Sequence, residues 1–352
     1  MGMITSVIVL SLLIFFHELG HFLAARFFGV HVEVFSIGFG KKVISKTIGA
    51  TEYCLSLIPL GGYVQMKGQD DSDPTKVSYD ADSYTVKRPW QKIVILFAGP
   101  FANFLLAFVL FFAIGTLGIT KFTPTIGKIS ENSPAFNAGL QEKDTILMIN
   151  KQPIRMWDDV SSYIQSAEGL IELTIEREGQ TRIVIVEPKL NTYKNMFGET
   201  MTKKMVGILP LGTTTIITYS LAELPLFAWQ ETEKSTMMII TGLQKLVEGV
   251  VSPKELGGII SIVQITSEAS QMGLVALFSL TALISVNLGV LNLLPIPALD
   301  GGHIMFNLYE MITKRPPSEK VLSTLTMMGW VLLLGLMVLS LFNDIYRLTN
   351  GN

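Results

Sequence analysis

The chain has 352 residues, with 27 Lys and Arg against 29 Asp and Glu, so its formal net charge is -2. Charged residues make up 16% of it, against roughly 25% in an ordinary soluble domain. Disorder is excluded, because 49% of the residues are apolar. The lack of a basic excess excludes nucleic acid as the main partner. Two classes are left: an unusually apolar soluble protein, or a membrane protein with a soluble part.

The distribution of the charges favours a membrane protein. Four apolar stretches are free or nearly free of charge, and each is long enough to cross a hydrocarbon core of roughly 30 Å. They are Ile4–Ala25, Ile93–Ile119, Ala269–Leu299 and Val321–Phe342. The region between the second and third stretches, Lys121–Glu268, is far more charged and predicts an inserted soluble module.

This pattern divides the chain into four parts. Residues 1–120 hold the first two spans and a β-loop at 31–68, where alternating apolar residues and glycines predict short strands. Residues 121–215 are predicted to form an α+β domain. Residues 216–268 hold an amphipathic helix, expected at the membrane–water interface, and a connector. Residues 269–352 hold the last two spans.

Basic residues in the short loops predict the orientation. The loop at 26–92 holds nine Lys and Arg residues, and the loop before the last span adds Lys314, Arg315 and Lys320. The positive-inside rule therefore puts these two loops in the cytoplasm. Both termini and the inserted domain are expected on the other side.

A metal-binding motif, His17-Glu18-Leu19-Gly20-His21, lies at membrane depth in the first span. Two histidines four residues apart share one helix face, so both imidazoles can reach one metal ion. Zinc suits these ligands and lowers the pKa of its bound water toward about 7, and Glu18 can accept a proton from that water. The alternative is a pair of packed histidines on a soluble helix. It is weak here, because ionisable residues inside a span mark functional sites.

A catalytic zinc ion takes a third protein ligand and leaves one position open. Asp300 closes the third apolar stretch, where Pro295 and Pro297 break the helix. It is therefore a candidate third ligand, and its ordinary structural role would be the N-cap of the following helix. His303 is a rival ligand, and His31 is expected to be a structural loop residue.

Taken together in this order, the motifs resemble the site-2 protease family of intramembrane zinc metalloproteases, and within it the bacterial group that processes anti-sigma factors. The resemblance runs nearly end to end. Its motifs are His17–His21, Gly38-Phe39-Gly40, Pro59–Val64, Ala98–Asn103 and Asn292–Gly301.

The resemblance implies roles for individual residues. His17, His21 and Asp300 would be the ligands of one Zn2+ ion, Glu18 the general base, and Asn292 a polar group near the reacting carbonyl. From the residues alone, Asn292 would be assigned to helix packing.

The resemblance also implies where a substrate binds. The family has a membrane-associated β-loop beside its substrate, and an exposed strand edge there could pair with an extended substrate segment. The implied substrate-binding residues are Gly38, Gly40, Gly61, Gly62 and Tyr63. A purely cytoplasmic hairpin is the alternative for this loop.

The inserted region resembles a single PDZ domain over about 122–190. Its predicted elements are strands at 125–129, 144–150, 171–177 and 181–186, a short helical turn at 133–140 and a helix at 157–167. Lys143 stands where the family usually has a glycine before Asp144. The domain would either bind a peptide ligand or act as a cap that excludes bulky substrates.

The predicted fold is a polytopic α-helical membrane protein with four transmembrane helices, a membrane-associated β-loop and one inserted extracytoplasmic PDZ-like α+β domain. The predicted function is that of a zinc-dependent metalloendopeptidase in the bacterial cytoplasmic membrane. It would cut single-span membrane proteins, such as anti-sigma factors, within or beside their transmembrane segment. Its partners would be these substrates, the lipid bilayer and a peptide ligand of the PDZ-like domain, with no nucleic acid.

Two other functions are weighed against this one. A catalytically silent PDZ-containing membrane receptor or scaffold is disfavoured, because such a protein would be free to lose Glu18. A transporter that uses intramembrane histidines is disfavoured, because no inverted repeat is visible between the two halves of the sequence.

Overall fold

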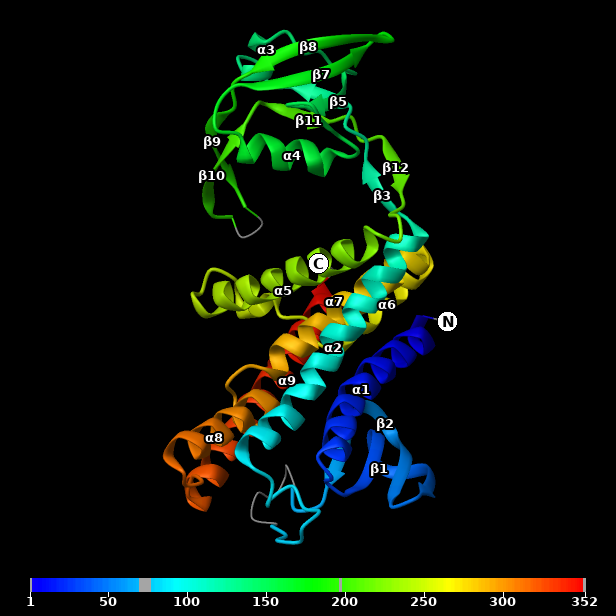
Figure 1. Cartoon of the computed structure of the whole chain (residues 1–352), viewed down its shortest axis with the longest axis vertical. Helices are drawn as coiled ribbons and strands as arrows, with labels where there is room; N and C mark the ends of the chain where they lie inside the picture. The colour runs from blue at the N-terminus through cyan, green and yellow to red at the C-terminus, as the bar shows by residue number, and fades with distance from the viewer. Residues whose placement is uncertain (1, 70–76, 196–197, 351–352) are drawn as a thin grey trace. The chain divides into compact units, whose positions relative to one another are not determined.

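A computed structural model describes residues 2–69, 77–195 and 198–350 of the chain (Figure 1). The chain divides into two compact units. The first unit is formed by Met1–Ile114 together with Leu221–Asn352, and the second is Gly115–Ser220.

Four helices in the described part of the chain are long and apolar enough to cross a membrane. They are α1 (Gly2–Phe27), α2 (Pro89–Leu117), α7 (Leu274–Asn292) and α9 (Glu319–Asn350). Each of the four predicted spans is thereby confirmed as a long apolar helix. The third span is shorter than its uncharged stretch: Gly273, at φ 113°, separates α7 from α6, and Pro295 cannot continue a helix.

Three further α-helices belong to the described part of the first unit. They are α5 (Leu224–Val247), α6 (Ile259–Met272) and α8 (Asp300–Thr313), and a 3-10 turn, η1 (Pro253–Glu255), precedes α6. Helix α6 packs against α1, α7 and α9, and α5 packs against α7. The amphipathic helix predicted within 216–268 corresponds to α5, whereas the sequence does not predict α6 as a separate helix.

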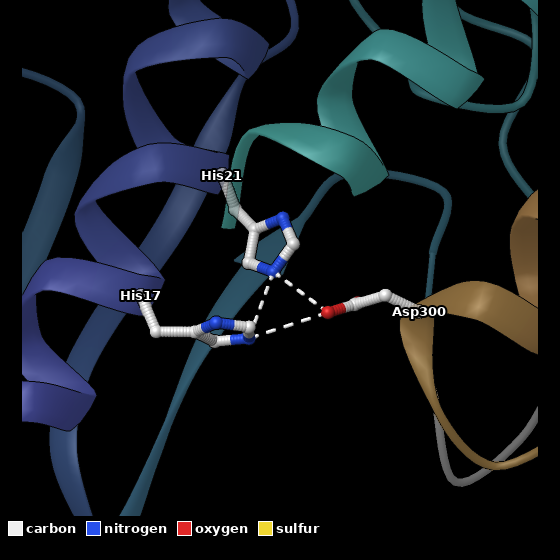
Figure 2. Close-up of side chains that lie close together, drawn as sticks. All are labelled: His17, His21 and Asp300. Atoms are coloured by element: carbon white, nitrogen blue, oxygen red, sulfur yellow. Dashed lines mark hydrogen bonds and ion pairs between the residues drawn. The ribbon is translucent and has the colours of Figure 1, made fainter. Parts of the chain in front are cut away.

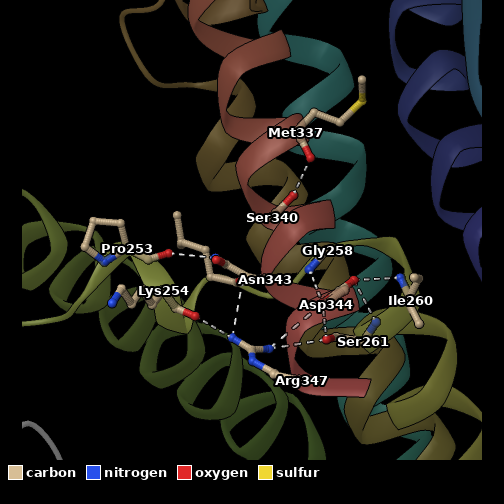
Figure 3. A network of polar contacts seen from close by, with 11 residues as sticks. Pro253, Lys254, Gly258, Ile260, Ser261, Met337, Ser340, Asn343, Asp344 and Arg347 are labelled. Carbon is tan, nitrogen blue, oxygen red and sulfur yellow. Dashed lines mark hydrogen bonds and ion pairs between the residues drawn. The ribbon is translucent and has the colours of Figure 1, made fainter. Parts of the chain in front are cut away.

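The end of α9 is fastened to η1 and to the start of α6 by a polar network (Figure 3). The buried carboxylate of Asp344 accepts hydrogen bonds from the backbone N–H groups of Gly258, Ile260 and Ser261. These N–H groups have no partner within α6, so the carboxylate caps that helix from a neighbouring one. Arg347 donates to the carbonyl of Lys254 at 2.9 Å.

The β-loop is a sheet built from β1 (Val32–Ile48) and β2 (Thr51–Met66), and it packs against α1. Val34–Ile37 pair on one side with Gly62–Gln65 and on the other with Glu52–Leu55. The chain therefore folds back within each strand. The sequence predicts several short strands in this loop, whereas the structure joins them into two long strands.

The second unit has a four-stranded sheet in the order β6-β5-β7-β8. Buried Ile126, Ile146, Leu173 and Ile175 belong to its core, together with Val160 from α4. The elements up to residue 186 are β3 (Ile119–Phe122), β4 (Ile126–Ile129), α3 (Pro134–Asn137), β5 (Thr145–Ile149), β6 (Gln152–Pro153), α4 (Trp157–Ser166), β7 (Ile171–Arg177) and β8 (Gln180–Val186). Apart from β3 and β6, which were not predicted, they follow the predicted order.

Four further strands in this unit were not predicted: β9 (Lys189–Lys194), β10 (Thr200–Met205), β11 (Ile208–Pro210) and β12 (Thr214–Ile217). Strands β9 and β10 pair with each other, and their polar, mostly exposed residues lack the alternation that marks a strand. Strands β11 and β12 return to pair with β4 and β3. The α+β character of the insert is confirmed, and its PDZ assignment stays a prediction.

Lys143, which stands where a glycine is usual, has a left-handed backbone conformation. Its φ is 72°, in the left-handed region that glycine enters freely and other residues enter at a cost. Next to it, Asp144 is fully buried and accepts two hydrogen bonds of 2.7 Å from the guanidinium group of Arg177. The carboxylate raises the pKa of Arg177, because it stabilises the charged guanidinium.

Candidate metal centre

Three side chains of the first unit bring one ligand atom each to the same point (Figure 2). Nε2 of His17 lies 3.3 Å from Oδ2 of Asp300, and Nε2 of His21 lies 3.5 Å from the same oxygen. The two Nε2 atoms are 3.3 Å apart. Within the ranges that the structure describes, this is the one group of His, Cys, Asp and Glu that could hold a metal ion.

The triangle has the dimensions that zinc requires. Ligands at about 2.0–2.1 Å from a tetrahedral zinc ion lie roughly 3.3–3.4 Å from one another. The other nitrogen of His21 is already committed: Nδ1 lies 2.9 Å from the carbonyl oxygen of Ile95 and can only donate to it. The lone pair of Nε2 is therefore left for a metal. This donor set fits a zinc ion with three protein ligands.

Two glycines allow α1 and α2 to approach at this point. A Cβ atom on Gly20 would lie 2.1 Å from the carbonyl oxygen of Ala98, and one on Gly99 would lie 2.2 Å from Nε2 of His21. Both positions are buried. Any larger residue at either position would push the helices apart or displace the imidazole, so the motif Ala98–Asn103 is explained by packing beside the histidines.

Asp300 reaches the histidines from the first turn of α8. The loop before it turns sharply, and a Cβ atom on Gly301 or Gly302 would lie 2.3 Å from a backbone oxygen of that loop. The N-cap position of α8 belongs to Leu299, so the structural role considered for Asp300 does not apply. His303 lies one turn further along α8 and is outside the group of ligand atoms.

A cavity of about 620 Å³ adjoins the three ligand atoms. Of the residues predicted from the sequence, Glu18, Asn292, Gly61, Gly62 and Tyr63 line it. The amide nitrogen of Asn292 lies 3.5 Å from Nε2 of His17. Strand β2 passes close to the glutamate, because a Cβ atom on Gly62 would lie 3.1 Å from Cγ of Glu18.

Two of the predicted substrate-binding residues, Gly38 and Gly40, are not among the residues that line the cavity. Both have positive φ, 91° and 85°, and they flank Phe39, which does line it. The ring of Phe39 stacks on that of Tyr63, with centroids 6.2 Å apart and an interplanar angle of 5°. The two glycines therefore shape the strand that presents Phe39.

Sequence reasoning missed Asn103 and Trp330 as residues of the site. Both line the cavity, and the amide of Asn103 is 3.3 Å from Nδ1 of His17. In the sequence, the one signal for Asn103 is its place in the motif Ala98–Asn103. Trp330 lies on α9 in an apolar stretch, where no pattern in the sequence distinguishes it from a residue that faces lipid.

The helix with the motif His17–His21, a carboxylate that closes a triangle with both histidines and helices of membrane-spanning length are together typical of a membrane metallopeptidase. The model of peptidase family M50 matches residues 5–336. The chain therefore belongs to peptidase family M50.

The chain is also similar to curated relatives over nearly their whole length. The chain is 49% identical over 345 residues to a protein of Campylobacter jejuni, covering 98% of this chain and 93% of that one. It is 39% identical over 351 residues to a protein of Helicobacter pylori strain J99, covering 98% and 99%. It is 34% identical over 361 residues to a protein of Agrobacterium fabrum, covering 97% and 95%. Each of the three is named as a candidate zinc metalloprotease.

Proposed function

We propose that the chain is an intramembrane zinc metalloprotease that hydrolyses peptide bonds within or beside the transmembrane segment of single-span membrane proteins. One observation carries the proposal. The triangle of His17, His21 and Asp300 has the size of a zinc site, and Glu18 lines the cavity beside it, on a helix of membrane-spanning length.

The roles of the residues follow from their positions. His17, His21 and Asp300 would hold the zinc ion, which when bound supplies a Lewis acid that makes water nucleophilic at neutral pH. Glu18 accepts a proton from the attacking water at its carboxylate and returns it to the nitrogen of the leaving amine. The amide N–H of Asn292 donates to the carbonyl oxygen as negative charge develops there.

A substrate helix must be opened before it can be cut, because its carbonyl groups are already hydrogen-bonded and lipid offers no water. Strand β2 could stabilise the opened substrate, because its residues Gly61–Met66 line the cavity. An extended substrate segment that paired with the edge of β2 would replace the lost hydrogen bonds of the substrate helix with strand pairing. Its peptide carbonyl would then lie beside Glu18.

We propose that the enzyme is a multi-pass protein of the bacterial cytoplasmic membrane. The distribution of Lys and Arg in the loops supports an active site toward the cytoplasm, with both termini and the second unit outside. The element order of the second unit supports a PDZ-like domain that binds a peptide or excludes bulky substrates. Anti-sigma factors are the proposed substrate class. The alternative function is that of a catalytically silent PDZ-containing receptor.

The proposal is tested with purified full-length protein in detergent and a model single-span substrate. Glu18→Gln keeps the three ligands and removes the base. We expect wild type and Glu18→Gln to retain equal zinc, and only wild type to cleave. Equal cleavage by both proteins would rule out the mechanism, and lack of zinc in wild type would rule out the metal site.

A further inference from the structure

Asn103 lies on α2 beside the outer nitrogen of a proposed zinc ligand. Its side chain is fully buried, and its amide nitrogen is 3.3 Å from Nδ1 of His17. The amide oxygen, Oδ1, is also buried and has no hydrogen-bond partner in the described part of the chain. Contact with the imidazole is therefore the one hydrogen bond of this side chain that the structure records.

The protonation of His17 decides how this contact works. With Nε2 facing Asp300 as a metal ligand, the proton of a neutral imidazole is on Nδ1, which must then donate. An amide nitrogen cannot accept that proton, whereas the amide oxygen can. The N and O atoms of an asparagine amide are interchangeable by a half-turn of the side-chain group. That half-turn breaks no hydrogen bond of Oδ1, because Oδ1 makes none.

The outer nitrogen of His21, Nδ1, also lies beside α2. This nitrogen donates to the backbone carbonyl oxygen of Ile95, also on α2. The backbone carbonyl of Asn103 accepts a hydrogen bond of 2.7 Å from the hydroxyl of buried Ser285 on α7, and this bond does not involve the side-chain amide. Helix α2 thus lies beside the outer nitrogen of both histidines, with the carbonyl of Ile95 at His21 and the side-chain amide of Asn103 at His17.

We propose that Asn103 is a positioning residue that accepts a hydrogen bond from Nδ1–H of His17 through its amide oxygen, and so fixes the tautomer and orientation in which His17 binds zinc. This inference rests on the proposed function, because it assumes that His17 is a zinc ligand. Outer acceptors of this kind change metal affinity by about 10- to 100-fold when they are removed.

Three variants separate this role from simple packing. Asn103→Leu has a similar volume and no acceptor, and Asn103→Asp keeps the oxygen acceptor but cannot donate. Ser285→Ala removes the hydrogen bond to the backbone of Asn103 and leaves its amide intact. The dissociation constant for zinc is measured for each full-length variant in detergent by competition with a chelator, and the visible spectrum of the Co2+-loaded protein reports the ligand geometry.

We expect Asn103→Leu to bind zinc about 10- to 100-fold more weakly than wild type and to have an altered Co2+ spectrum. Asn103→Asp should bind within a few fold of wild type, as should Ser285→Ala. Wild-type affinity in Asn103→Leu would overturn the inference. Equal weakening of zinc binding in Asn103→Asp and Asn103→Leu would also overturn it. If Asn103→Leu does not fold, weakened zinc binding in folded Asn103→Asp would overturn it.

His17→Ala distinguishes this failure from failure of the proposed function. If His17→Ala loses zinc while Asn103→Leu keeps it, the inference alone is wrong. If His17→Ala binds zinc as tightly as wild type, His17 is not a ligand, and the proposed metal site and the inference fall together.

Discussion

Nδ1 of His21 donates a hydrogen bond of 2.9 Å to the carbonyl oxygen of Ile95, and through this bond α2 sets the direction in which the imidazole presents Nε2. The bond is buried, so no water competes for it. A backbone acceptor cannot be lost by mutation of a side chain, and it ties the candidate metal centre to the packing of α1 on α2. Residues at that helix contact are therefore expected to affect zinc binding without touching the metal.

Gly99→Ala tests this packing directly. The new Cβ atom would lie 2.2 Å from Nε2 of His21, so the imidazole must move from its place. We expect zinc affinity to fall by more than about 10-fold, as for the loss of an outer hydrogen bond. Gly335→Ala on α9 is the matched control, because nothing lies within 4 Å of its new Cβ atom. Unchanged zinc affinity in Gly99→Ala would show that the approach of the helices does not position His21.

The third ligand is tested by comparing two residues of α8. Asp300→Ala should release zinc to a chelator at concentrations that leave wild type loaded, because its Oδ2 atom completes the triangle. His303→Ala should keep zinc, because His303 is outside the group of ligand atoms. Zinc content measured by atomic absorption after dialysis decides between them. Retention in Asp300→Ala together with loss in His303→Ala would reassign the ligand.

Asp144→Ala is expected to destabilise the second unit by about 3 kcal/mol, because it leaves the guanidinium group of Arg177 without its buried partner. Hydrogen–deuterium exchange of β5 and β7 in the full-length protein measures the effect. Lys121→Ala is the control: it removes the more exposed ion pair with Asp158, and such pairs contribute about 0–1 kcal/mol. If β5 and β7 were equally protected in Asp144→Ala and Lys121→Ala, the buried pair of Asp144 and Arg177 would not stabilise the second unit as expected.

Asp344→Ala should loosen the start of α6, because three backbone N–H groups lose their acceptor. Leaving buried polar groups unpaired costs about 1–3 kcal/mol for each group, less where water can reach them. We expect faster amide exchange at Gly258–Ser261 than in wild type. Ser340→Ala, which removes only a hydrogen bond to Met337 on the exposed face of α9, should leave this exchange unchanged. Full protection in Asp344→Ala would show that α6 does not need this cap.

Local patterns predicted the parts of the site that lie within one element. The spacing of His17 and His21 placed both imidazoles on one helix face, and lack of charge marked the helices that could span a membrane. Asp300 was assigned as the third ligand through a resemblance to a known family, because no periodicity connects residues so far apart in the chain. From the residues alone it was one of two candidates.

The parts that sequence reasoning missed depend on contacts between elements. The hydrogen bonds of Ile95 and Asn103 to the histidines exist because α1 and α2 approach closely at Gly20 and Gly99. The break at Gly273 lies inside an uncharged stretch, so a charge criterion could not detect it. Strands β9 and β10 lack a regular alternation of apolar and polar residues, and pairing between them, rather than burial, marks them as strands.

The most direct test of the central claim is the position of the cut. A single-span substrate is reconstituted with the full-length enzyme in liposomes, and the products are identified by mass spectrometry, with Glu18→Gln as the matched inactive enzyme. We expect products that end within or beside the transmembrane segment and that appear with wild type alone. A cut confined to a part of the substrate far from the membrane, or the same products with Glu18→Gln, would contradict the central claim.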